Sequence, residues 1–491
     1  MELAVVILYS SALLLIFLFS LGQLNLSVHY HRAKRKENSD KNNLKLPGQL
    51  PHVTVQLPIY NELYVIDRLI EAIASLEYPK EKLEIQVLDD STDETVEAIA
   101  RKVVDMQKKG IDIHHIRRPD REGFKAGALK YGLEMAKGSL IAIFDADFIP
   151  QQDFLINTVP HFVDERIGVV QTRWGHLNKN YSLLTKLQAF GLDAHFSVEQ
   201  TGRSEAGSFI NFNGTAGVWR KKCIEDAGGW SPDTLTEDLD LSYRAQLKGW
   251  KFRYMEDVEA PAELPVLMSA IKSQQYRWNK GAAETAKKNL GKVLRSGIGL
   301  ENKIHAVFHL FNSSIFVCLL LAAILSIPML YIKFLNPSYN ILFDVGSIFL
   351  LGFFSIGYFY WVAAKRMEPI GTVRYFLKTF PFFLIVSMGL SLHNAFAVLE
   401  GLFGYKTPFV RTPKFNVTDS NKKWHHNIYI KNKINLVTIA EGILSIYFIF
   451  GIAFGIHLQD FGLILFHLML AAGFGSVFYH SVKPAFYEQP I

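Results

Sequence analysis

The stretch Leu140-Ile141-Ala142-Ile143-Phe144-Asp145-Ala146-Asp147 (residues 140–147) decides the fold class. Its apolar part is typical of a buried strand, and two carboxylates one residue apart follow it directly. Upstream, short apolar runs alternate with segments of helical spacing. The expected strands are Val53–Leu57, Ile85–Leu88, Ile111–Ile116 and Leu140–Phe144, and the expected helices are Leu63–Leu76, Glu94–Met106 and Phe124–Ala136. Repeated βα units of this length predict a parallel, doubly wound α/β sheet.

Polar clusters follow three of the expected strands. They are Tyr60-Asn61-Glu62, Asp89-Asp90 and Asp145-Ala146-Asp147. Doubly wound sheets bind their ligands beyond the carboxyl ends of the strands. We therefore expect the three clusters to converge at one edge of the sheet and to form a site there.

The composition indicates a mixed chain. Of its 491 residues, 49% are hydrophobic, which is high for a soluble protein, and 20% are charged, which is high for a membrane bundle. One soluble domain and several membrane segments are therefore expected. The net charge of +6 does not indicate a nucleic-acid-binding protein, because Lys and Arg cluster beside apolar segments. Cys223 lies in the soluble block and Cys318 in an apolar run, so we expect no disulfide and a cytosolic soluble block.

The amino-terminal segment is predicted to be a membrane helix. Residues 3–28 carry no charge and are long enough to cross a hydrocarbon core of ~30 Å. A basic cluster at 31–36 follows, which places residue 1 outside and the next block in the cytosol. A secretory signal peptide is the alternative, but the basic cluster follows the apolar run and no small-residue cleavage site is evident.

Further apolar stretches follow the soluble block. They cover 304–332, 345–364, 379–399, 442–459 and 461–482. If 379–399 crossed the membrane, the loop 401–433, with seven Lys and Arg residues and one acid, would lie outside. We therefore expect an interfacial or re-entrant helix over about 370–400 and five spans in total. A sixth span is the alternative.

Acids after the expected strands suggest nucleotide and metal binding. Asp89 or Asp90 can accept hydrogen bonds from a nucleobase or ribose, although Ser91-Thr92-Asp93 also suits a helix cap. Asp145 and Asp147 can share a hard cation that bridges the phosphates of a nucleotide donor. A chance surface loop is the alternative for this pair. Lys125, at a glycine-rich helix start, can help to neutralise the phosphates.

Two later motifs suggest transfer chemistry. An acid in Thr236-Glu237-Asp238 can take a proton from an attacking hydroxyl, although these residue types also suit a helix N-terminus. In Gln274-Gln275-Tyr276-Arg277-Trp278, the arginine can clamp a diphosphate and the tryptophan can face a sugar ring. A membrane-interface belt is the alternative for that motif. Asn213-Gly214-Thr215 matches a glycosylation sequon, but in a cytosolic domain we expect a loop that closes over the acceptor.

These residues resemble the processive, membrane-integrated family 2 glycosyltransferases, which include cellulose and hyaluronan synthases. Over about 53–282 the pattern resembles in particular the plant mannan synthases and xyloglucan-backbone glucan synthases of the cellulose-synthase-like group. The segments that carry the resemblance are Gln86–Thr92, Lys125–Leu129, Phe144–Phe148, Phe212–Arg220, Asp226–Trp230 and Gln274–Trp278. It covers about half of the chain closely and the membrane half loosely.

The resemblance implies a domain order. A transmembrane helix at 1–28 would precede a cytosolic, Rossmann-like GT-A domain at 45–285. Interfacial helices, a gating loop at about 405–420 and four transmembrane helices would occupy 286–491. The protein would then be a multi-pass membrane protein of a bacterial inner membrane, or of a Golgi or plasma membrane if it is eukaryotic.

The resemblance also implies an inverting transfer with Mg²⁺ or Mn²⁺ as cofactor. Asp238 would be the general base in the catalytic motif that begins with Thr236 and Glu237, and Asp145 and Asp147 would organise the metal. Trp278 would stack on the terminal sugar of the acceptor, beside the loop Asn213, Gly214 and Thr215. The expected donor-binding residues are Tyr60, Glu62 and Asp89 at the nucleoside, Lys125 and Arg277 at the diphosphate, and Asp90, Asp145 and Gln274.

A gating loop over the donor is expected at Phe409-Val410-Arg411-Thr412-Pro413-Lys414, which resembles the family pattern Phe-x-Val-Thr-x-Lys. Phe409, Arg411, Thr412 and Lys414 are its predicted contacts. Arg411 stands where the family has valine, and Phe415-Asn416-Val417-Thr418 offers a rival match.

Three functions are consistent with this sequence. The first is a processive synthase that polymerises a β-linked mannan or glucan from GDP-mannose or UDP-glucose and exports it through its own channel. The second is a non-processive transferase that acts on a lipid acceptor. The third is a catalytically silent membrane subunit or polysaccharide channel, which the presence of every acid disfavours. The expected partners are the sugar nucleotide, the growing polysaccharide and the lipid bilayer.

Overall fold

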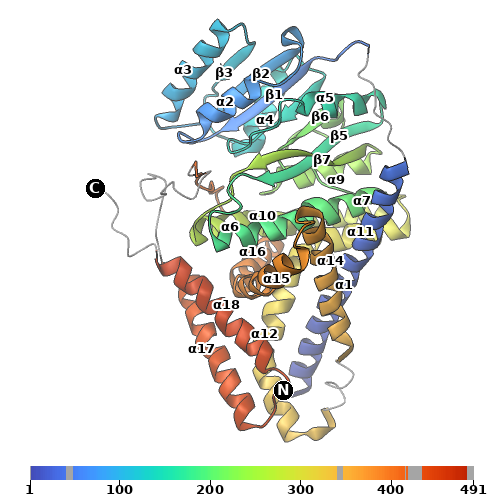
Figure 1. Cartoon of the computed structure of the whole chain (residues 1–491), viewed down its shortest axis with the longest axis vertical. Helices are drawn as coiled ribbons and strands as arrows, with labels where there is room; N and C mark the ends of the chain where they lie inside the picture. The colour runs from blue at the N-terminus through green and yellow to red at the C-terminus, as the bar shows by residue number, and fades with distance from the viewer. Residues whose placement is uncertain (1, 40–47, 340–346, 415, 418–433, 484–491) are drawn as a thin grey trace.

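The computed structural model describes residues 2–39, 48–339, 347–414, 416–417 and 434–483 (Figure 1). A seven-stranded sheet with the order β3-β2-β1-β4-β6-β5-β7 forms the upper part of the molecule in that view. The strands are β1 (Val53–Ile59), β2 (Leu83–Asp89), β3 (Ile113–Ile116), β4 (Leu140–Ile143), β5 (Ile167–His176), β6 (Gly217–Arg220) and β7 (Lys251–Ala262). All four strands predicted between residues 53 and 144 are present.

The sheet is mixed. β1 pairs in parallel with β2 and with β4, β2 pairs in parallel with β3, and β5 pairs in parallel with β7. β6 runs antiparallel to both β4 and β5. The parallel, doubly wound arrangement predicted for the first four strands is therefore confirmed. The reversal at β6 was not predicted, because β6 lies beyond the repeated βα units on which the sequence prediction rested.

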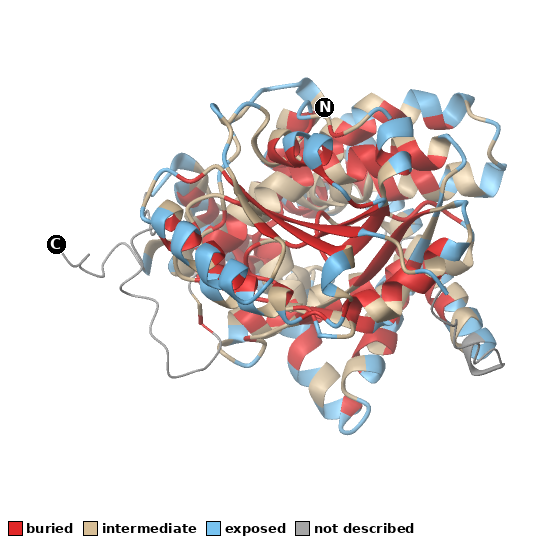
Figure 2. Ribbon diagram, turned by 90° about the horizontal axis from the view of Figure 1, so that it is seen from above, coloured by how far each residue is buried: buried red, intermediate tan, exposed pale blue. Residues whose placement is uncertain are grey.

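Helices cover both faces of the sheet. Leu140 and Ala142 of β4 lie in a core cluster with α2 and α3, whereas Ile141 and Ile143 lie in a second cluster with α4, α8 and α9. This division follows from the period of two in a strand. The covering helices are α2 (Ile66–Ala74), α3 (Thr95–Lys108), α4 (Phe124–Met135), α5 (Phe154–Thr158), α8 (Lys221–Asp226) and α9 (Glu237–Leu247). Figure 2 shows the strands buried at the centre.

Four helices among the described residues are long and apolar enough to cross a membrane. They belong to α1 (Glu2–Ser39), α12 (Ile315–Leu335), α17 (Leu436–His457) and α18 (Ile464–Val482). They extend away from the sheet in the lower half of Figure 1. α1 continues past the predicted end at residue 28, and its basic end contacts the sheet domain, where Lys34 Nζ lies 2.8 Å from Glu256 Oε2.

Two predicted membrane features are less regular. α15 (Thr372–Gly389) and α16 (Ser391–Phe403) form an apolar pair bent by 51°, which fits either a broken span or the predicted re-entrant helix over about 370–400. The span predicted over 345–364 corresponds to α14 (Leu350–Met367), which is not one of the four helices above. Its tyrosines and its terminal Lys365 and Arg366 lower its apolar character. The number of spans therefore stays a prediction.

α10 (Met268–Arg295) joins the two halves of the molecule. It lies below the sheet in Figure 1, in a layer with α6 (Leu183–Ala194), α7 (Gln200–Glu205) and α11 (Leu300–Leu310). Its residues Met268 and Ile271 pack against Leu390, at the bend between α15 and α16, and against Val477 of α18. Cys223 and Cys318 are both free, as expected.

Candidate active site

A pocket lies where the carboxyl ends of β1 and β4 meet α9 and α10. Most of the residues predicted from the sequence line it: Tyr60, Glu62, Asp90, Lys125, Asp145, Asp147, Asn213, Gly214, Thr236, Glu237, Asp238, Gln274, Arg277, Trp278, Phe409, Arg411, Thr412 and Lys414. Side chains that are separated by up to about 350 residues of sequence therefore share one cavity. Asp89 and Thr215 do not line it.

Asp89 is buried behind the pocket. Its carboxylate accepts hydrogen bonds of 2.8 Å from the Ser91 amide and of 2.8 Å from His115 Nε2. Burial favours the protonated acid, but these hydrogen bonds outweigh it and lower the pKa of Asp89. A direct contact of Asp89 with the donor remains a prediction. His115 orients this acid.

Asp90 faces the pocket and is held by arginine. Arg118 donates from Nε and Nη2 to both Asp90 oxygens, at 2.7 and 2.6 Å. The cap interpretation of the same segment also holds, because Asp93 Oδ1 accepts a hydrogen bond of 3.0 Å from the Thr95 amide. The Arg121 guanidinium lies 3.4 Å from the centre of the Tyr60 ring. An aromatic ring with a cation on one face is a suitable surface for a nucleobase.

Asp145 and Asp147 follow β4, and each contacts a lysine. Lys125 Nζ donates to Asp145 Oδ1 at 2.5 Å and to the Gly214 carbonyl at 2.8 Å. Lys414 Nζ donates to Asp147 Oδ2 at 2.6 Å. Two carboxylates that face one cavity are the oxygen ligands that Mg²⁺ and Mn²⁺ prefer. The residues present thus fit a divalent cation that replaces one of these lysines.

Thr236, Glu237 and Asp238 occupy the start of α9, with Thr236 at the N-cap. Glu237 is buried and Asp238 half-buried. Desolvation in the pocket raises the pKa of Asp238 to about 7, and the Glu237 carboxylate adds to this effect. The same desolvation raises the pKa of Glu237. A carboxyl whose pKa lies near neutrality is suited to general base catalysis.

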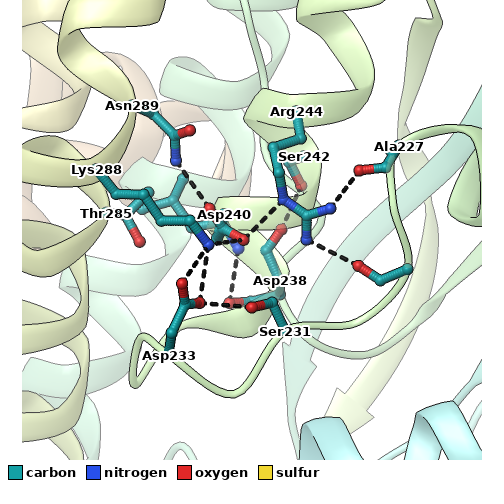
Figure 3. A network of polar contacts seen from close by, with 12 residues as sticks. Ala227, Ser231, Asp233, Asp238, Asp240, Ser242, Arg244, Thr285, Lys288 and Asn289 are labelled. Atoms are coloured by element: carbon teal, nitrogen blue, oxygen red, sulfur yellow. Dashed lines mark hydrogen bonds and ion pairs between the residues drawn. The ribbon is translucent and has the colours of Figure 1, made fainter.

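Figure 3 shows how α9 is anchored to α10. The fully buried Asp240 accepts hydrogen bonds from Arg244 Nε at 2.9 Å, Lys288 Nζ at 3.0 Å and Asn289 Nδ2 at 2.9 Å. The backbones also approach closely, because a Cβ atom on Gly281 of α10 would lie 2.8 Å from the Thr236 amide nitrogen. The acids of α9 and the polar face of α10 are therefore fixed relative to each other.

α10 presents Gln274, Arg277 and Trp278 to the pocket. Arg277 Nη2 donates to Thr412 Oγ1 at 2.8 Å. Among the residues that the structure describes, no group accepts a hydrogen bond from the buried Nε of Arg277, which suits an anionic ligand. Trp278 lies 6.4 Å, centre to centre, from the ring of Trp174 in β5. The two indoles give the pocket an aromatic wall.

The segment predicted to be the gating loop lies over the pocket. Phe409 stacks on Phe124 at 5.7 Å, Arg411 Nη1 lies 2.8 Å from Glu62 Oε2, and Lys414 contacts Asp147. Burial raises the pKa of Glu62 to about 7, although the nearby Arg411 opposes this shift. Of the rival match 415–418, residues 415 and 418 lie outside the described residues.

Comparisons with known proteins identify the family. Residues 51–281 match the family model described as glycosyltransferase like family 2. The protein named glucomannan 4-beta-mannosyltransferase 7 from Arabidopsis thaliana is 33% identical over 411 residues, which cover 80% of this chain and 70% of that protein. The chain belongs to glycosyltransferase family 2. Its pocket is therefore the candidate active site of a transferase.

Rice (Oryza sativa subsp. japonica) supplies further relatives in this glycosyltransferase family. Probable glucomannan 4-beta-mannosyltransferase 4 is 39% identical over 326 residues, which cover 62% of this chain and 59% of that protein. Probable glucomannan 4-beta-mannosyltransferase 11 is 46% identical over 267 residues, which cover 53% of this chain and 47% of that protein. The chain thus spans about half of the length of these relatives.

A solved structure supports the fold. The mannosyltransferase PcManGT from Pyrobaculum calidifontis, in complex with GDP-Man and Mn²⁺, superposes with a TM-score of 0.55 and 19% sequence identity. The match covers 81% of this chain and 100% of that one. Together with the mixed seven-stranded sheet, it confirms the predicted GT-A fold of the glycosyltransferase domain.

The sequence did not reveal a buried network beneath this glycosyltransferase site. His195 and Glu199 lie in a π-helical turn between α6 and α7, and His195 Nδ1 is 3.0 Å from Glu199 Oε2. His195 Nε2 lies 3.3 Å from Asn213 Oδ1, and Arg203 pairs with Glu199 at 3.0 Å. The i, i+4 spacing of His195 and Glu199 on a helix was a usable signal, but nothing in the sequence linked it to Asn213.

Proposed function

We propose that this glycosyltransferase polymerises a β-linked mannan from GDP-mannose. The observation that carries the proposal is the single pocket that gathers Asp145 and Asp147, Asp238 and Arg277 from three distant motifs. The names of the plant relatives, and the GDP-Man bound by the archaeal structure, favour mannose over glucose as the transferred sugar. Glucose remains the alternative hexose.

The donor would bind along the strand ends. The Tyr60 ring and the acids Glu62 and Asp90 would contact the nucleoside. Lys125, Arg277 and Lys414 supply positive charge for the diphosphate, which charge-assisted hydrogen bonds favour. A divalent cation held by Asp145 and Asp147 would stabilise the charge of the departing nucleoside diphosphate.

Asp238 would act on the acceptor. The hydroxyl oxygen at the end of the growing chain forms a bond to the anomeric carbon of the donor, and the bond from that carbon to the phosphate oxygen breaks. Asp238 takes the hydroxyl proton, and the nucleoside diphosphate leaves with the bonding electrons. One displacement of this kind inverts the anomeric configuration. Trp278 and Trp174 would stack on the acceptor rings.

The loop Phe409–Lys414 would open and close over the donor. The cavity has a volume of about 180 Å³. Small-molecule sites usually measure roughly 300–1,000 Å³, so the loop must move before a sugar nucleotide can enter. Its contacts with Glu62, Arg277 and Asp147 are polar and can be exchanged for contacts with the donor.

The proposal also includes processive export of the polymer. α10 carries Trp278 on the pocket side and packs against membrane helices through Met268 and Ile271. An acceptor that stacks on Trp278 would therefore lie close to the membrane helices, which we propose form the exit path. In this arrangement the sheet domain lies on the cytosolic side.

The proposal is tested by the product. Purified protein in lipid vesicles is supplied separately with labelled GDP-mannose and UDP-glucose, each with Mn²⁺. We expect GDP-mannose alone to give long chains that an endo-β-1,4-mannanase digests. A single labelled sugar in the lipid extract would instead indicate the lipid-acceptor transferase. Incorporation from neither donor would contradict a transferase function.

A further inference from the structure

Three metal-binding side chains meet away from the transferase pocket, where α1 lies against α11. They are His29 of α1 with Glu301 and His305 of α11. One ligand atom from each lies within 4.8 Å of the others. The rings of His29 and His305 are 6.3 Å apart, centre to centre, and Glu301 and His305 share one helix face because they are four residues apart.

The donor set selects a class of metal. Two imidazoles and one carboxylate bind Zn²⁺ and Co²⁺ well, with three protein ligands and one position left for water. This set differs from the Asp145 and Asp147 pair, whose oxygens suit Mg²⁺ or Mn²⁺. None of the three residues lines the transferase pocket.

The surroundings give a metal access to these side chains. Glu301 and His305 line a cavity of about 500 Å³ beside α1, which provides a path of entry. Burial and the positive charge of Arg203 lower the pKa of His305, whereas the nearby Glu301 carboxylate opposes this shift. Arg203 is itself neutralised by Glu199 at 3.0 Å, so it does not prevent cation binding.

We propose that His29, Glu301 and His305 bind a transition metal, with Zn²⁺ as the expected ion, and that this metal joins the amino-terminal membrane helix to α11. The metal would fix α1 on the layer that carries α10 and α11. It takes no part in sugar transfer, so the proposal does not depend on the proposed function.

Cobalt provides a direct probe, because nitrogen ligation in a four-coordinate site gives visible absorption bands that an all-oxygen site does not. The full-length chain, purified in detergent with an affinity tag free of histidine, is titrated with Co²⁺ and then with Zn²⁺. We expect the bands to saturate at one equivalent of Co²⁺ and to vanish as Zn²⁺ displaces it. We also expect Zn²⁺ to raise Tm.

Variants locate the ion. His29→Ala and His305→Ala should lose the bands and the rise in Tm, and Glu301→Gln should bind roughly 10-fold more weakly or worse. His31→Ala is the matched control, because His31 lies on the same helix and contacts Tyr358 instead. If His29→Ala does not fold, His29→Asn is measured in its place. Asp147→Asn should keep the bands. Unchanged binding in both histidine variants, or loss in Asp147→Asn, would overturn the proposal.

Discussion

The Nζ atom of Lys414 lies 2.6 Å from Oδ2 of Asp147, although 267 residues separate them in the chain. This ion pair closes the loop Phe409–Lys414 over the pocket, and it uses an oxygen that we assign to the metal. Under this assignment, Lys414 and the metal would compete for Asp147. On donor binding, the lysine would exchange this carboxylate for a phosphate.

Replacing Lys414 with Met should separate the competition of the lysine with the metal from its contact with the donor phosphate. The Mn²⁺ concentration for half-maximal activity should fall, because Asp147 no longer has a competing cation. The KM for the sugar nucleotide should rise roughly tenfold or more, which corresponds to one lost charge-assisted hydrogen bond. Steady-state kinetics in vesicles measure both constants. Lys406→Met, at an exposed site three residues before this loop, should change neither, and equal effects of the two substitutions would contradict this role.

Asp240 should be a stability determinant that contacts no substrate. Asp240→Ala leaves Lys288 and Arg244 without their buried partner (Figure 3). Removing one member of such a network costs roughly 3 kcal/mol, so Tm should fall by several degrees. Asp105→Ala, in an exposed pair with Lys108, should lower Tm little. Thermal melts in detergent measure the Tm of both variants. Equal Tm values would show that the buried network contributes nothing to stability.

Activity should depend on pH through Asp238. The base works as the carboxylate, and the pKa of Asp238 is raised to about 7. kcat/KM for the acceptor should therefore rise with pH, by about tenfold for each unit below pH 7, and level off above it. Ionisation of Glu62, whose pKa is also raised to about 7, strengthens its pairing with Arg411 and would steepen this limb beyond about tenfold per unit. A rate that does not change between about pH 5.5 and 8 would contradict the assignment of the base.

His195 should act as a positioning residue for the loop that contains Asn213. Glu199 raises the pKa of His195, although burial alone would lower it, so the ring can donate to both Glu199 and Asn213. His195→Leu should reduce kcat more than tenfold and leave the donor KM within about twofold. His195→Gln, which keeps a donor, should recover part of kcat. His114→Leu, on the half-buried edge strand β3, is the control. A similar loss in all three variants would indicate a structural defect only.

Local pattern was sufficient to predict the sheet as far as residue 144, because short runs rich in apolar and β-branched residues alternate there with segments of helical spacing. Convergence of the motifs at one sheet edge also followed from topology. Roles assigned to single residues stay predictions.

Contacts between distant segments were beyond the sequence. Three such contacts depend on how β5, α10 and the loop meet in space. They are the ion pair of Lys414 with Asp147, the contact of Asp89 with His115 behind the pocket, and the contact of Trp174 with Trp278. The sequence also could not predict that Asp240 faces α10, because its neighbours Glu237 and Asp238 line the pocket instead. These are tertiary effects that no local spacing encodes.

Transfer from labelled GDP-mannose by the Asp238→Asn variant tests the account most directly. Because the pKa of Asp238 is raised in the folded protein from 3.8 to about 7, its ionisation costs stability as pH rises through that window. The uncharged amide should therefore not lower Tm at pH 8. We predict polymer synthesis at least roughly 100-fold below wild type at unchanged Tm, with Asp233→Asn near wild type. Wild-type synthesis by Asp238→Asn would contradict the account.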